Sequence, residues 1–209
     1  MRTIMETKVL SINDPDALNL AVKILAAGGL VVFPTDTVYG VGAMAFNDQA
    51  VSMISDVKGR SGEKAIPILI GDYNQLNLVS SGVNSICEKL ARRFWPGPLT
   101  IVLPRHDSIP DAVSPLPTVG VRIPDFAATI ELLKLTGPLA VSSANLSGQG
   151  SSSTIRGVLS QLNGKIGLIL DGGMTPGGTP STVVDCSHGQ PTILREGPIS
   201  LEQIQNALF

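Results

Sequence analysis

The chain has 209 residues, of which 43% are hydrophobic and only 15% are charged, and its formal net charge is −2. This length and composition predict one compact domain over residues 1–209. The negative charge disfavours a protein that grips nucleic acid mainly by neutralising its phosphates, because such proteins are basic. Any anion site in this chain is therefore expected to be local.

The compartment is predicted from what the sequence lacks. Cys87 and Cys186 are too few for the framework of a disulfide-rich secreted domain, and reduced thiols fit the cytoplasm. The first residues lack the apolar run of a signal peptide. No segment approaches the ~20 apolar residues that a bilayer span needs. We therefore expect a cytoplasmic protein with no membrane partner.

Helices and strands are predicted to alternate along the first half of the chain. The first helix begins at Asn13-Asp14-Pro15 and ends at Gly28-Gly29, and a buried strand follows at residues 30–33. Apolar residues at positions 50, 51, 54 and 57 mark a second helix, which carries Lys58 and Arg60 at its C-terminal end. A strand at 66–70 and a helix at 83–94 come next.

The second half continues the alternation. Strands are predicted at 99–103, 119–123 and 139–141, with helices at 127–135 and 154–162. Three closely spaced strands at 168–170, 182–185 and 192–194 suggest antiparallel pairing, and Ser200 caps a last short helix. The pattern predicts an α/β fold with an open, twisted, mixed sheet and flanking helices.

Several familiar chemistries find little support. Neither His106 nor His188 lies in a nucleophile motif, which disfavours a Ser-His-Asp triad. Cys186 and His188 are too few ligands for a zinc site. Gly40-Val41-Gly42 fits a dinucleotide fingerprint only loosely, so its glycines are predicted to make a tight turn. An enzyme that acts by positioning and charge remains.

Two segments offer the groups that a polyphosphate needs. Lys58-Gly59-Arg60 supplies two fixed cations, and residues 142–148 supply hydroxyl and amide groups. Each has a plainer interpretation, because cations favour helix C-termini and a serine-rich loop often caps the next helix. Arg122, inside an apolar strand, is costly to bury unpaired. It either clamps a substrate carboxylate or pairs with an internal Asp or Glu.

Seven separated segments together resemble the YrdC-type threonylcarbamoyl-AMP synthases, the TsaC-like enzymes of tRNA modification, in their short single-domain form. The segments are residues 34–40, 58–60, 94–100, 121–124, 143–148, 181–185 and 194–197. The resemblance implies a YrdC-like fold around a large concave cavity. It also implies synthesis of threonylcarbamoyl-AMP and pyrophosphate from L-threonine, bicarbonate and ATP, for the t6A modification at position 37 of tRNA.

The resemblance extends to partners and individual residues. Mg²⁺ is expected with ATP and without a protein metal ligand, and tRNA or proteins of a tRNA-modification complex are expected partners. Lys58 and Arg60 are the expected catalytic residues. The residues expected to bind ATP are Lys58, Arg60, Lys64, Thr118, Ser143, Asn145, Ser151 and Arg195. Those expected to bind threonine are Thr37, Arg122, Val141 (through its backbone) and Ser181.

The chain departs from the family pattern at two positions. Leu69 stands where the family often has a histidine, which puts one threonine contact in doubt, and Ser142 stands where it often has proline. Two alternatives stay open: a paralogue of the same fold that transfers carbamoyl groups, and a non-catalytic RNA-binding module. The 4% aromatic content disfavours the module, because it leaves little for base stacking.

Overall fold

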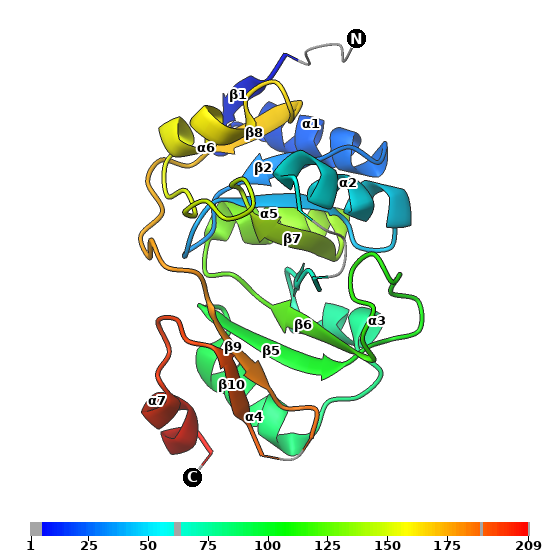
Figure 1. The fold of residues 1–209 in the computed structure, drawn as a ribbon, viewed down its shortest axis with the longest axis vertical. Helices are drawn as coiled ribbons and strands as arrows, with labels where there is room; N and C mark the ends of the chain where they lie inside the picture. The colour runs from blue at the N-terminus through cyan, green and yellow to red at the C-terminus, as the bar shows by residue number, and fades with distance from the viewer. Residues whose placement is uncertain (1–5, 61–63, 189, 209) are drawn as a thin grey trace.

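The computed structural model describes residues 6–60, 64–188 and 190–208. Within these ranges ten strands form one sheet in the order β1-β8-β2-β3-β7-β4-β6-β5-β9-β10, which runs along the long axis of the molecule (Figure 1). The strands are β1 Lys8–Ser11, β2 Val31–Phe33, β3 Gly40–Met44, β4 Ile68–Leu69, β5 Leu99–Pro104, β6 Thr118–Arg122, β7 Leu139–Ser143, β8 Leu168–Asp171, β9 Thr182–Asp185 and β10 Thr192–Arg195.

The helices of the described ranges are α1 Pro15–Ala26, α2 Asp48–Lys58, the 3-10 turn η1 Tyr73–Gln75, α3 Leu76–Val79, α4 Ser85–Phe94, α5 Ala127–Thr136, α6 Ile155–Leu162 and α7 Leu201–Asn206. Six of these helices lie close to their predicted positions, and the short η1 and α3 were not predicted. Among helices of the described ranges, none has both the length and the apolar character needed to cross a membrane.

The sheet is mixed, as predicted. β8 is parallel to β1 and β2, β4 is parallel to β6, and β5 is parallel to β9; the remaining neighbours are antiparallel. The predicted antiparallel pairing in the last third holds for β9 and β10. It is wrong for β8, which inserts between β1 and β2 at the opposite end of the sheet.

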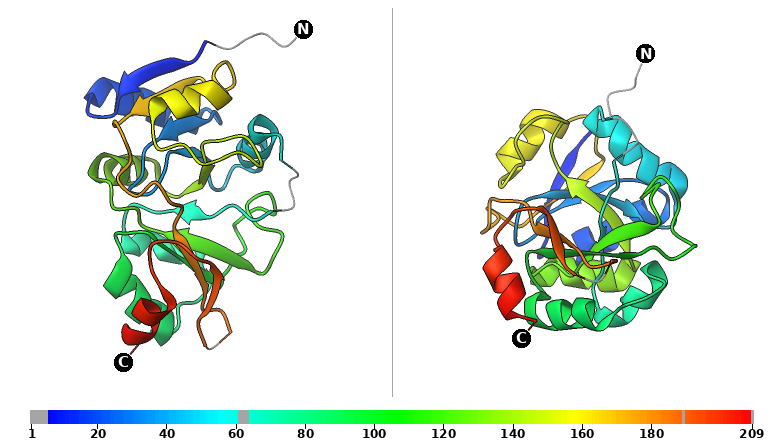
Figure 2. Two further views of the ribbon diagram at one scale, coloured as in Figure 1. Left: turned by 60° about the vertical axis from the view of Figure 1, so that its left-hand side comes forward. Right: turned by 60° about the horizontal axis from the view of Figure 1, so that its bottom comes forward.

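The two faces of the sheet differ in what covers them. The first face, which carries Val32 and Val121, packs with α2, α4 and α6 in one large apolar cluster. The second face carries Val31 and packs with α1 and α5 in a smaller cluster. Because the sheet twists, α4 and α5 lie on the same side of the molecule although they cover opposite faces (Figure 2). On the second face, Leu69 of β4 is the register partner of Arg122 on β6.

Local signals explain where α2 ends and so where its cations lie. The side chain of Asn47 caps the helix by accepting a hydrogen bond from the amide of Ala50. Gly59 terminates it with φ of 61° and ψ of 41°, the left-handed conformation that glycine adopts at least cost. Lys58 is therefore the last helical residue, and Arg60 begins the next segment.

The prediction of a tight turn at Gly40-Val41-Gly42 is wrong. These residues form β3, between β2 and β7 near the middle of the sheet. A Cβ on Gly40 would lie 2.6 Å from Cγ1 of Val141, and one on Gly42 would lie 2.8 Å from Cε1 of Phe33. The glycines therefore let bulky side chains of the neighbouring strands cross over β3. Close approach inside a strand and turn flexibility give the same sequence signal.

Other differences concern short elements. The strand predicted at 66–70 reduces to Ile68–Leu69, and β1, η1 and α3 were not predicted. These elements span only two to four residues each. Such short runs carry too little periodicity to be recognised from the sequence.

Substituting Gly42 tests the close packing around β3. Gly42→Ala forces the buried ring of Phe33 to move, so we expect a loss of about 1–3 kcal/mol in the free energy of unfolding. Gly82→Ala is the control, because a Cβ there meets no atom within 4 Å. Urea unfolding of both variants measures the effect. Equal stabilities of the two variants would contradict the packing described.

Candidate functional site

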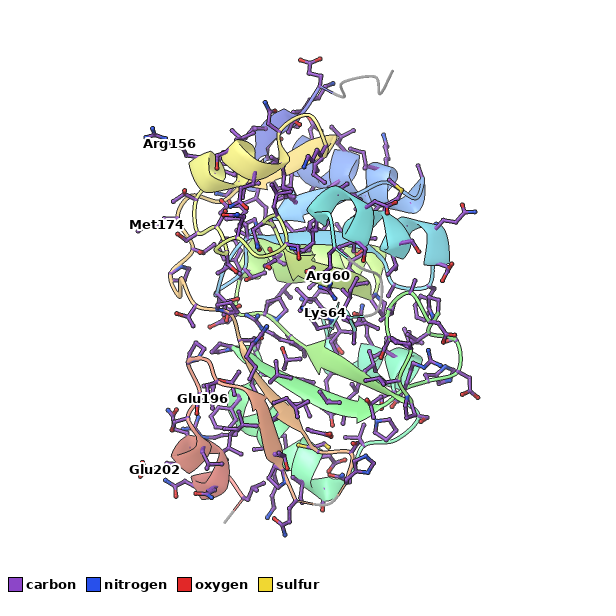
Figure 3. All side chains as sticks on the ribbon, viewed as in Figure 1. Arg60, Lys64, Arg156, Met174, Glu196 and Glu202 are labelled. Atoms are coloured by element: carbon purple, nitrogen blue, oxygen red, sulfur yellow. The ribbon has the colours of Figure 1, made fainter. Side chains whose placement is uncertain are left out.

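One cavity of about 340 Å³ collects most of the residues predicted to bind substrates. It lies where the upper strands of Figure 1 (β2, β3, β7) meet the lower ones (β6, β5, β9). Figure 3 places Arg60 between these two groups of strands. The predicted residues that line the cavity are Thr37, Arg60, Arg122, Val141, Ser143, Asn145, Ser151, Ser181 and Arg195.

The charge of this cavity is positive although the chain is acidic overall. Its charged lining residues, within the described ranges, are Arg60, Arg122 and Arg195, with no Asp or Glu among them. Burial lowers the pKa of each of the three guanidinium groups from its usual value, and they remain cations at neutral pH. Three partly desolvated cations in one hollow fit a ligand with several negative charges.

Arg122 is the most deeply buried of these cations, with 5% of its surface exposed. Its Nε donates to the carbonyl of Gly97 at 2.9 Å and its Nη1 to Oγ1 of Thr37 at 3.1 Å, while its Nη2 forms an ion pair with Asp36. An internal carboxylate therefore does pair with Arg122. Of its five N–H groups, one on Nη1 and one on Nη2 have no partner among the described residues.

Arg195 and Ser181 form a second polar unit on the lower strands. Arg195 donates from Nε and Nη2 to the carbonyl of Ser181, at 3.0 and 2.7 Å, and from Nη2 to its Oγ at 3.1 Å. Oγ of Ser181 also lies 2.8 Å from Oγ1 of Thr100 on β5. These contacts fix the side chains at one end of the cavity.

Lys58 lies behind the cavity wall. It is 4% exposed, and its Nζ donates to the carbonyls of Ser143 and, at 2.7 Å, of Asn145. The amide of Ser147 donates back to the carbonyl of Lys58 at 2.9 Å. Burial, and then repulsion from Arg60, lower the pKa of Lys58 to about 8. Lys58 therefore joins the end of α2 to the segment after β7.

Two buried polar atoms at the upper end of the cavity have no partner among the described residues: Nε of Arg60 and Oδ1 of Asn145. The amide of Asn145 donates to the carbonyls of Leu146 and Gln149, at 2.8 and 2.7 Å. These two carbonyls fix its orientation, because only the NH₂ group can face them. The unpaired acceptor and the unpaired donor are features of a ligand site.

Not every predicted residue lines the cavity. Lys64 is exposed, and its carbonyl accepts a hydrogen bond from Nη2 of Arg60. Thr118 lies at the start of β6, where its carbonyl accepts from Oγ of Ser114 at 2.8 Å. The chain departs from the family pattern at Leu69 and Ser142, and both residues line the cavity.

Sequence reasoning missed several residues that shape the site. Thr35, Thr100 and Gln149 line the cavity, and Asp36 holds Arg122. The amides of residues 177 and 178, in the segment from β8 to β9, donate to the carbonyls of Asp36 and Thr37 at 3.0 and 2.8 Å. Polar residues at the ends of buried strands were the available signal for Thr35 and Thr100, whereas the other contacts depend on the folded chain.

An open α/β sheet with an arginine-rich, hydroxyl-lined cavity is an arrangement suited to small polyanionic ligands. The model of the Sua5/YciO/YrdC family, described as telomere recombination, matches residues 23–197. The chain belongs to this family, and its fold is YrdC-like.

Relatives of this chain are known in bacteria and archaea. A Bacillus subtilis threonylcarbamoyl-AMP synthase is 41% identical over 205 residues, which are 95% of this chain and 58% of the relative. A Mycobacterium leprae relative is 38% identical and covers 96% of this chain and 94% of its own length. The crystal structure of Pyrococcus abyssi Sua5 complexed with L-threonine matches with a TM-score of 0.91 and 38% identity, over 99% of this chain and 61% of that one. The chain thus spans about three fifths of some of its relatives.

The role of Lys58 as a structural link can be tested without any ligand. Lys58→Met removes one donor from the carbonyl of Ser143 and leaves the carbonyl of Asn145 without a donor among the described residues, so we expect a loss of about 1–3 kcal/mol in the free energy of unfolding. Lys64→Met, at an exposed position, should change it by less than about 0.5 kcal/mol. Chemical denaturation measures both. A Lys58→Met variant as stable as Lys64→Met would show that the link is unimportant.

Proposed function

We propose that this chain is an L-threonylcarbamoyladenylate synthase, a nucleotidyltransferase that makes threonylcarbamoyl-AMP and pyrophosphate from L-threonine, bicarbonate and ATP. The product would serve the t6A modification at position 37 of tRNA. The observation that carries the proposal is the cavity: three arginines and several hydroxyl groups surround one hollow with no lining carboxylate among the described residues. The relatives named threonylcarbamoyl-AMP synthase support the same conclusion.

We assign the nucleotide to the upper end of the cavity. Arg60 would contact the phosphates, and Oδ1 of Asn145 would accept a hydrogen bond from a hydroxyl or amino group of the nucleotide. Ser143 and Ser151 offer further donors. Lys58 would contribute positive potential from behind the wall. Lys64 and Thr118 were also predicted to contact ATP. Neither residue lines the cavity, so its geometry does not support these two contacts, and we keep them as proposals only.

Magnesium would enter as part of the ATP complex. Within the described ranges, no three His, Cys, Asp or Glu side chains gather in a way that could hold a metal ion. The donor set of the cavity therefore fits a magnesium ion that keeps the phosphates as its main ligands. The arginines would neutralise the remaining charge of the triphosphate.

We assign threonine to the lower end. The two unpaired N–H groups of Arg122 suit a carboxylate, which can accept two parallel hydrogen bonds. Thr37 and Ser181 offer hydroxyl groups in the same cavity, and Val141 lines it from β7. Asp36 would act as a positioning residue, because its carboxylate holds the guanidinium from the side away from the substrate.

The reaction needs no enzyme nucleophile. The amine of threonine attacks the carbon of bicarbonate, an N–C bond forms, and water leaves with the oxygen lost from bicarbonate. An oxygen of the resulting carbamate attacks the α-phosphorus of ATP, and the bond to pyrophosphate breaks. Negative charge grows on the leaving pyrophosphate, where Arg60 and Lys58 would stabilise it. Holding both reactants in one hollow supplies roughly 7–11 kcal/mol of the barrier reduction.

The size of the cavity bears on the RNA-binding alternative. A hollow of about 340 Å³ is at the lower end of the range for small-molecule sites. The arginines line this hollow, whereas a non-catalytic RNA-binding module would use an extended cationic groove along the backbone. Small substrates are therefore the better match.

Pyrophosphate release tests the proposed function directly. The protein is incubated with ATP, magnesium, threonine and bicarbonate, and then with each of threonine and bicarbonate omitted in turn. The proposal predicts release only in the complete mixture, with threonylcarbamoyl-AMP as the other product. Release without threonine, or no release in the complete mixture, would reject it.

A substitution of Arg122 tests the carboxylate contact. Arg122→Lys keeps the charge but loses the planar two-point geometry, so the KM for threonine should rise at least about tenfold. The KM for ATP should change less than about twofold, since the nucleotide lies at the other end. Arg105→Lys, at a pair with Asp111 on the surface, is the control. An unchanged threonine KM in Arg122→Lys would refute the contact.

The pH dependence of ATP binding tests the part played by Lys58. The pKa of this residue is lowered to about 8, so it is charged at pH 7 and largely neutral at pH 9. The loss of a nearby cation should weaken ATP binding as pH rises through about 8. Calorimetric titration with ATP at several pH values measures the change. The Lys58→Met variant should bind more weakly with little change across this range, and an equally steep decline there would contradict the assignment.

A further inference from the structure

Two buried hydroxyl groups face each other at the lower end of the cavity. Thr100 on β5 is 2% exposed and Ser181, just before β9, is 5% exposed. Their oxygens lie 2.8 Å apart, and both residues line the cavity. β5 and β9 run side by side in parallel, which fixes the pair from two strands (Figure 1).

Counting protons shows that this pair has a donor to spare. Each hydroxyl carries one proton, and their mutual hydrogen bond uses one of the two. Oγ of Ser181 accepts a further hydrogen bond from Nη2 of Arg195, which brings no acceptor for the second proton. Whichever hydroxyl donates, one O–H is left without an acceptor among the described residues. A buried donor of this kind calls for a ligand oxygen.

The surroundings favour a negatively charged ligand. Arg195 uses Nε and Nη2 on Ser181, which leaves Nη1 without a partner in the described part of the chain. After burial, the positive charge of Arg195 also lowers the pKa of Arg122, so the two guanidinium groups lie near each other. A hydroxyl proton beside two guanidinium groups is a suitable environment for a small oxyanion.

The pair lies at the lower end of the cavity, where a residue assigned to threonine contacts a residue predicted to bind ATP. Ser181 is assigned to threonine, Arg195 is among the residues predicted to bind ATP, and these two residues are in direct hydrogen-bond contact. The atoms that join threonine to AMP in the product come from bicarbonate. They must therefore lie where the residues of the two substrates meet.

We propose that Thr100, Ser181 and Arg195 form the subsite for bicarbonate and for the carboxylate group of the carbamate made from it. This inference rests on the proposed synthase function and adds the location of its third substrate. The spare hydroxyl proton and Nη1 of Arg195 donate to the oxyanion. They hold its carbon toward the threonine amine while the N–C bond forms and water leaves.

Bicarbonate kinetics test the subsite. Thr100→Val keeps the shape of the side chain but removes its hydroxyl. The variant therefore loses either the spare O–H donor itself or the acceptor that orients the O–H of Ser181. With ATP and threonine saturating, the KM for bicarbonate should rise about tenfold or more, because a hydrogen bond to a charged group is lost. The KM values for ATP and threonine should change less than about threefold. Thr100→Ser retains the hydroxyl and should restore the bicarbonate KM to within about threefold of the unsubstituted protein.

Thr182→Val is the matched control. Thr182 is the next residue after Ser181, is fully buried, and places its hydroxyl against the backbone of Ile199 and not in the cavity. The Thr182→Val variant should leave the bicarbonate KM unchanged within about twofold. If Thr100→Val does not fold, Thr100→Ala is measured in the same way, and it too must raise the bicarbonate KM.

Two results would overturn the subsite. One is an unchanged bicarbonate KM in the Thr100→Val variant. The other is an equal rise in the KM for threonine, which would assign the pair to the amino acid. Both are distinct from failure of the proposed function, because that failure would appear in the unsubstituted protein as the absence of threonine-dependent and bicarbonate-dependent pyrophosphate release.

Discussion

The site depends on the contacts of the buried Arg122 guanidinium, above all its ion pair with Asp36. This guanidinium joins the segment between β2 and β3, through Asp36 and Thr37, to the lower strands, through the carbonyl of Gly97. The two groups of strands that wall the cavity are thus held together at its floor. Breaking a buried ion pair by removing one partner costs about 3–5 kcal/mol, because the other charge is left unpaired. The same guanidinium keeps two donors for a substrate.

The other contacts distribute donors around this floor. Lys58 anchors the segment after β7, so that Asn145 presents an unpaired acceptor to the upper end. Arg195 holds Ser181 at the lower end. The cavity gathers three arginines and, among the described residues, no lining carboxylate, so its local charge is positive although the chain is acidic overall. Such a site suits the proposed chemistry by orientation and charge, since its lining in the described part of the chain pairs no nucleophile with a base.

Much of the fold and part of the site could be predicted from the sequence. The apolar residues at positions 50, 51, 54 and 57 located α2 and its cations, because helical spacing is a local signal. The glycines of β3 led to the wrong prediction of a turn. Their role is to make room for the side chains of Phe33 and Val141 from the neighbouring strands. The partner of Arg122 and the pairing of Thr100 with Ser181 join residues far apart in the chain. Only the folded sheet brings such residues together.

A double-mutant cycle on the ion pair between Asp36 and Arg122 tests the central claim most directly. The free energy of unfolding is measured for Asp36→Asn, for Arg122→Gln, for the double variant and for the unsubstituted protein. A buried, connecting pair predicts a coupling energy above about 1.5 kcal/mol, with the double variant less destabilised than the sum of the single ones. Additivity within about 0.5 kcal/mol would mean that the pair does not hold the two parts of the site together.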